Sequence, residues 1–155
     1  MSIMNINHLL DFQLWTNELI KNATLEVEDI DSKSAENIRS LRQLLEHYVE
    51  SYDYSWLKES EYKGRMENLH SMSLQELLAE LDRSASKFYE VMKNISEEKE
   101  VQVSKDKKVT LSRGNYILLH TDHLTYHRGQ IVTALKKLGS DGVNLDYYSF
   151  ILETL

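Results

Sequence analysis

The stretch that decides the fold class reads SLQELLAELDRSASKFYEVMKNI, from Ser73 to Ile95. It opens with a capping box, in which the Ser73 and Glu76 side chains each accept a hydrogen bond from the other residue's backbone N–H. Apolar side chains then recur every three or four residues as far as Ile95. This spacing places them on one face of a helix, so the sequence predicts an amphipathic α-helix over this stretch.

Three further stretches have helical spacing, roughly Asn5 to Leu25, Ser34 to Glu59 and Ser112 to Leu138. Ser34 is the expected N-cap of the second of these helices. Gly139 follows the last one, at the position that a C-cap glycine occupies. Four long amphipathic helices indicate an all-α protein with the architecture of a four-helix bundle.

The remaining segments are short. Ser60 to Ser71 lacks the helical period and contains Gly64, so we interpret it as a connection. Val101–Ser104 and Val109–Ser112 alternate apolar and polar residues, which favours a small β-hairpin between the third and fourth helices. The apolar tail at 144–152 is expected to dock as a short terminal helix or an extended cap. We find no repeat and no composition break, so residues 1–155 are expected to form one domain.

Composition excludes several classes of protein. The 155 residues contain no cysteine, which excludes disulfides, thiolate nucleophiles and Cys-ligated metal sites. With no proline and five glycines, an all-β sandwich is disfavoured. The net charge of -7 argues against nucleic-acid binding. No long apolar run and no signal-peptide pattern is present, so we expect a cytoplasmic protein that does not bind a membrane.

Three histidines lie on the last predicted helix, within HTDHLTYHRGQ at 120–130. His123 and His127 are four residues apart, the spacing at which two imidazoles on one helical face can bind one metal ion. The alternative is a pair of partly buried histidines that hydrogen-bond to their neighbours. His120 lies at the centre of the apolar stripe, so we interpret it as a core histidine; the alternative is an auxiliary group beside the metal ligands.

His47 on the second predicted helix is the candidate third ligand. It lies about 130° from the centre of that helix's apolar stripe, at 100° per residue. A site that includes His47 would therefore lie at the boundary between two helices, within reach of solvent. Three protein nitrogens with one vacant position are more typical of a catalytic metal site than of a structural one.

The run LLHTDHLTYHRGQI, from Leu118 to Ile131, resembles the signature of the DinB-like (YfiT-like) family of proposed metalloenzymes. The similarity extends to FQLWTN at 12–17, LLEH at 44–47 and LDYY at 145–148. The resemblance implies a four-helix bundle, often homodimeric, with nickel or zinc bound by histidines that correspond here to His47, His123 and His127. Some members of this family are thiol-dependent S-transferases or isomerases, and many have no assigned substrate.

We therefore expect a divalent-metal-dependent enzyme that acts on a small molecule, either as an S-transferase using a low-molecular-weight thiol or as a hydrolase. An ion on neutral imidazoles would lower the pKa of a bound water or thiol toward neutrality. We expect Arg128 to bind either an anionic substrate group or a carboxylate elsewhere in the chain. The alternative is a non-catalytic metal-binding or stress-related bundle protein. The resemblance and the many aromatic residues also lead us to expect a homodimer.

Overall fold

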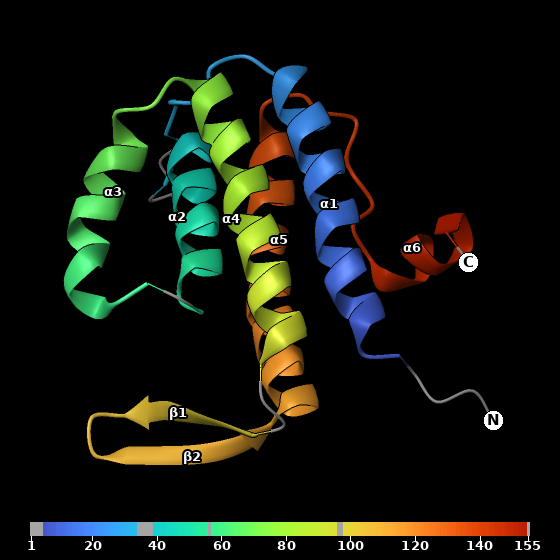
Figure 1. The fold of residues 1–155 in the computed structure, drawn as a ribbon. Coiled ribbons are helices and arrows are strands. Elements are labelled where there is room, and N and C mark those ends of the chain that lie inside the picture. The colour runs from blue at the N-terminus through green and yellow to red at the C-terminus, as the bar shows by residue number, and fades with distance from the viewer. Residues whose placement is uncertain (1–4, 34–38, 56, 96–97, 155) are drawn as a thin grey trace.

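The computed structural model describes residues 5–33, 39–55, 57–95 and 98–154. Its elements, shown in Figure 1, are α1 (Asn7–Leu25), α2 (Leu41–Asp53), a 3-10 turn (Glu59–Glu61), α3 (Tyr62–His70), α4 (Leu74–Asn94), β1 (Glu98–Ser104), β2 (Lys107–Ser112), α5 (Arg113–Lys137) and α6 (Tyr147–Thr154). The protein is thus mostly helical with one small antiparallel hairpin, and both features were predicted from the sequence.

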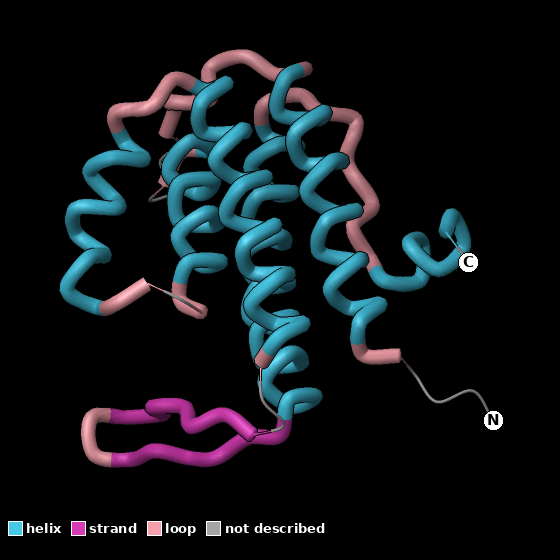
Figure 2. Tube along the Cα trace, in the orientation of Figure 1, coloured by secondary structure: helices cyan, strands magenta, loops and turns pink. Residues whose placement is uncertain are grey.

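The helices α1, α2, α4 and α5 lie side by side around a common core (Figures 1 and 2). α1 and α2 each pack against both α4 and α5. The core side chains with almost no exposure include Ile20, Leu45, Leu81, Phe88, Leu124 and Ile131. Burial of each such side chain contributes about 1.5–3 kcal/mol. The apolar stripes therefore account for how these four helices associate.

The helix starts follow from capping side chains. At Ser73 the predicted capping box is present: Ser73 Oγ accepts from the Glu76 N–H at 3.2 Å, and the Ser73 N–H donates to Glu76 Oε2 at 2.7 Å. α2 begins with a second capping box, between Ser40 and Gln43. The predicted N-cap Ser34 lies outside the described residues. The described helix is shorter than the predicted one, because the Ser40 capping box starts it and it ends at Asp53.

The prediction that residues 60–71 form only a connection is wrong, because Tyr62 to His70 form α3. Leu69 is the one residue of α3 that is fully buried, so this helix has almost no apolar stripe. Instead, Arg65 holds it in place through ion pairs of 2.7 Å to Asp53 on α2 and 2.7 Å to Glu80 on α4. The helix is therefore fixed by long-range charge pairs, which a hydrophobic period cannot reveal, together with the contacts of Met66 and Leu69 with the core.

The C-terminal half follows the sequence prediction closely. The hairpin pairs Val101 with Val109 and leads directly into α5, whose N-cap is Ser112. α5 ends at Lys137, and Gly139 has a φ of +95°, a conformation that favours glycine. The tail forms α6, which packs on α1 through Phe150. No helix in the described ranges is long and apolar enough to span a membrane.

Candidate functional site

The three histidines singled out from the sequence come together between α2 and α5. The His127 ring is central: its centroid is 4.5 Å from that of His123 and 4.6 Å from that of His47. Both ring pairs are edge-to-face, at 84° and 86°. The Nε2 atoms of His123 and His127 are 3.0 Å apart. His123 and His127, one turn apart on α5, thus meet His47 of α2, so that three imidazoles are in contact.

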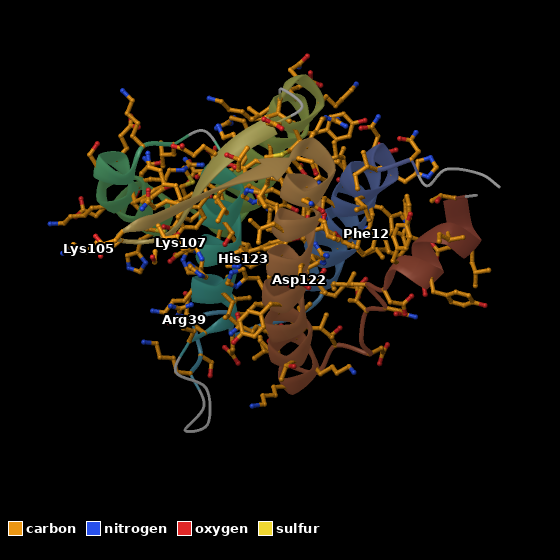
Figure 3. The ribbon with its side chains drawn as sticks, turned by 90° about the horizontal axis from the view of Figure 1, so that it is seen from below. Phe12, Arg39, Lys105, Lys107, Asp122 and His123 are labelled. Carbon is orange, nitrogen blue, oxygen red and sulfur yellow. The ribbon has the colours of Figure 1, made fainter. Side chains whose placement is uncertain are left out.

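The location of this cluster follows from helix packing. Leu45 and Val49 on α2, and Leu124 and Ile131 on α5, are buried where these helices join the core. The histidines lie on the flanks of the same two helices, so the cluster lies at the helix boundary. His127 is buried, His47 is partly exposed and His123 is exposed. The cluster is therefore open to solvent on the side of His123. Figure 3 shows His123 on α5, next to α2.

Two of the three imidazoles have a hydrogen-bond partner on Nδ1. His47 Nδ1 is 2.9 Å from Oε2 of Glu50, and His127 Nδ1 is 3.2 Å from Oε1 of Gln130. Each partner lies three residues after its histidine, which is the distance at which side chains on one helical face meet. The rings of His47 and His127 are therefore each fixed from within their own helix.

The environment favours neutral imidazoles. Burial lowers the pKa of His127 to about 4, the hydrogen bond to Gln130 opposes this shift, and the charges of His47, His123 and Arg39 reinforce it. Burial also lowers the pKa of His123, with the charge of His47 adding to the shift and Asp122 opposing it. Both rings are therefore uncharged near neutral pH and can offer a lone pair to a cation.

His120 lies apart from this cluster. Its half-buried ring packs edge-to-face on Tyr116 at 4.6 Å and on Phe88 of α4 at 5.4 Å. Burial, and then the charge of His123, lower its pKa to about 4. This is the packing role that its place on the apolar stripe predicted.

Arg128 points toward α1 and not toward the histidines. It is 2% exposed, its Nη1 donates to Oε1 of Gln13, and its Nη2 donates to Thr125 Oγ1 at 2.6 Å. The guanidinium also lies over the Phe12 ring, at 4.9 Å from its centroid. In Figure 3, α1 with Phe12 and α2 lie on opposite sides of α5. The structure therefore does not bring the predicted substrate contact Arg128 together with the three imidazoles.

A model of the DinB family matches residues 1–154. The chain belongs to the DinB family. This DinB-family protein also resembles the crystal structure of a candidate member of the DinB family from Exiguobacterium sibiricum, with a TM-score of 0.67. The two sequences are 18% identical, and the likeness covers 94% of this chain and 100% of that one, so it shows a shared fold. The search of curated proteins found no match.

Three polar residues that the structure gives a role were not singled out in the sequence. Glu50 and Gln130 could have been found, since each follows a candidate histidine by three residues. The third is Asn17 of the FQLWTN motif, which donates from Nδ2 to the Tyr52 hydroxyl at 2.9 Å and accepts from the Tyr48 hydroxyl at 2.7 Å. This fully buried cluster ties α1 to α2; the resemblance singled out the motif that contains Asn17, but no local pattern indicates its partners Tyr48 and Tyr52.

The histidine cluster is not a closed ligand cage as it stands. Within the described residues, no group of three or more His, Cys, Asp or Glu side chains is placed to hold a metal ion. The 3.0 Å contact between His123 and His127 is a hydrogen-bond distance, and the edge-to-face contacts show rings packed on one another. The arrangement places three nitrogen bases together, with their ring planes set by packing.

Proposed function

We propose that this DinB-family protein is a divalent-metal-dependent enzyme, with the ion held by His47, His123 and His127 in a four-helix bundle of α1, α2, α4 and α5. The observation that carries the proposal is the contact of the three imidazoles from two helices. Two nitrogen ligands of a tetrahedral ion with bonds of 2.0–2.1 Å are about 3.3 Å apart. The His123 and His127 Nε2 atoms, at 3.0 Å, are close to that separation.

The chemistry of the donor set supports this proposal. Gln130 Oε1 can only accept at His127 Nδ1, so that nitrogen carries the proton and Nε2 keeps a free lone pair. The lowered pKa values of His123 and His127 keep both rings neutral, as metal ligation requires. Imidazole nitrogens suit nickel and zinc, the two ions implied by the resemblance. Adjustment of the His47 side chain would complete the set, since its ring already contacts His127.

When bound, the ion supplies a Lewis acid beside an open coordination position. Because His123 is exposed, that position would lie within reach of a small substrate. Two reactions suit the site, hydrolysis and the transfer of a low-molecular-weight thiol. In the transfer, the thiol sulfur forms a bond to an electrophilic carbon, the leaving group departs with the bonding electron pair, and the thiol proton passes to solvent. The chain has no cysteine, so the thiol must be a separate molecule.

The proposal is tested with nickel- or zinc-loaded protein, prepared without a histidine tag. It is assayed against electrophiles together with small thiols, and against activated esters and amides without a thiol. We expect turnover that is lost in His47→Ala, His123→Ala and His127→Ala. His120→Ala is the matched control, because it lies one turn from His123 and packs on Phe88 and Tyr116 instead. Stoichiometric metal without turnover on any substrate would favour a non-catalytic metal-binding protein.

We also propose that the protein is a homodimer. The support is the resemblance together with the apolar surface of α6, on which Tyr148 and Leu152 are exposed. Light scattering at micromolar concentration should give twice the mass of the chain. A mass of one chain would contradict this proposal.

A further inference from the structure

We propose that Glu50 is a positioning residue that holds His47 in the tautomer with its proton on Nδ1. Held in this way, His47 offers its Nε2 lone pair as a ligand. The consequence for metal affinity rests on the proposed function. The consequence for the tautomer does not rest on the proposed function, because it concerns the metal-free protein.

The geometry of the pair supports this role. Glu50 Oε2 lies 2.9 Å from His47 Nδ1, and Glu50 is only 7% exposed. A carboxylate has acceptor sites only, so the hydrogen bond requires the proton on Nδ1. The other ring nitrogen, Nε2, is then an unprotonated base. A hydrogen bond between a carboxylate and the second nitrogen is the usual partner of a metal-ligating histidine, where it fixes both the tautomer and the ring orientation.

A second side chain lies near the carboxylate itself. Tyr54, the C-cap residue of α2, lies one turn after Glu50 and interacts with its carboxylate. Burial, and then the charge of Glu50, raise the pKa of Tyr54. Glu50 thus has His47 on one side and Tyr54 near it, and its 2.9 Å contact is the one to His47.

The same helix contains a natural comparison. Glu46 lies one turn before Glu50, is 3% exposed, and also contacts a histidine, with His70 Nδ1 at 3.3 Å from its Oε1. Glu46 further accepts from Arg42 Nε at 3.1 Å. His70 ends α3 and is not one of the three clustered histidines. Glu46 therefore provides a matched control: a buried glutamate in a Glu–His pair outside the site.

The first experiment measures the tautomer of His47 in metal-free protein by long-range proton–nitrogen NMR spectra of the imidazoles. We expect the Nδ1–H form in the wild type and in Glu50→Gln, whose amide oxygen can accept as Gln130 does for His127. Glu50→Ala should shift His47 toward the Nε2–H form. Glu46→Ala should leave the His47 signals unchanged. An Nε2–H tautomer in the wild type, or no change in Glu50→Ala, would overturn the proposal.

The second experiment measures affinity for Ni²⁺ and Zn²⁺ by competition with a coloured chelator, with circular dichroism to show that each variant is folded. Glu50→Ala should bind about 10–100-fold more weakly than wild type. Glu50→Gln and Tyr54→Phe should lose less, and Glu46→Ala should bind as wild type does. Equal affinity of wild type and Glu50→Ala would refute the positioning role and leave the proposed function intact. If the wild type bound neither ion, the proposed function would fail, and the tautomer experiment would still decide the role of Glu50.

Discussion

Replacing Tyr52 with phenylalanine removes one oxygen atom from the polar cluster that joins α1 to α2. Tyr52 is fully buried, and its hydroxyl lies 2.9 Å from Asn17 Nδ2 and 3.1 Å from the Tyr48 hydroxyl. A phenylalanine ring would keep the edge-to-face contacts with Tyr48 and Phe88, both at 5.3 Å. The substitution therefore tests the hydrogen bonds separately from the packing.

The expected loss of stability follows from the hydrogen-bond donor that would lose its acceptor. Without the Tyr52 hydroxyl, Asn17 Nδ2 would remain in the interior without the acceptor it has now. An unsatisfied buried donor costs about 1–3 kcal/mol, so we expect the free energy of unfolding to fall by about 2 kcal/mol. For a domain of this size the melting temperature should fall by about 4–8 °C.

Urea denaturation followed by circular dichroism measures this loss, with an unchanged m-value showing that the two states keep their compactness. Tyr126→Phe is the matched control, because this tyrosine is 67% exposed on α5 and the change keeps its ring, so its effect should stay within about 0.5 kcal/mol. A loss below about 0.5 kcal/mol for Tyr52→Phe would refute the reasoning. It would mean that the Asn17 cluster does not hold α1 against α2 next to His47.

Substitutions at three further residues test other parts of the structure. His120 has a pKa lowered from 6.5 to about 4, so the unfolded chain binds the proton first as the pH falls. In metal-free protein, the stability that His120 contributes should therefore decrease by about 2 kcal/mol from about pH 7 to about pH 5, and His120→Gln should remove that part of the pH dependence. Arg65→Met should cost about 3–5 kcal/mol in urea denaturation, because it leaves the fully buried carboxylate of Asp53 without its ion pair, whereas Glu80 keeps Arg83. A cost below 1 kcal/mol would show that α3 is held by other contacts. Ser73→Ala should cost about 1 kcal/mol in thermal unfolding, and Ser73→Asp, which keeps a capping oxygen, should restore most of it.

The sequence predicts helices best where their ends carry local signals. The ends of α4 and α5 were found within a residue or two, because Ser73, Ser112 and Gly139 act through their nearest neighbours. α3 was missed because Arg65 acts through residues on two other helices. A hydrophobic period describes one face of one helix, so it contains no information about such pairs.

The site likewise combines features that depend on one helix with features that depend on contacts between helices. The spacing of His123 and His127 is a property of one helix and can be read directly from the sequence. The spacing of Glu50 after His47 is equally local. The contact between the His47 and His127 rings depends on α2 packing beside α5, which periodicity alone does not specify. For that pairing, the resemblance to the DinB-like family provided the prediction that local physics could not.

The most direct test of the three-histidine site is a titration of metal-free, untagged protein with Ni²⁺ or Zn²⁺, with the bound ion counted per chain. We predict one ion in the wild type and in His120→Ala. His47→Ala, His123→Ala and His127→Ala should each lose stoichiometric binding while the helical signal stays near that of wild type. Full binding by His47→Ala together with loss in His120→Ala would contradict the account, because the ligands would then come from a single helix.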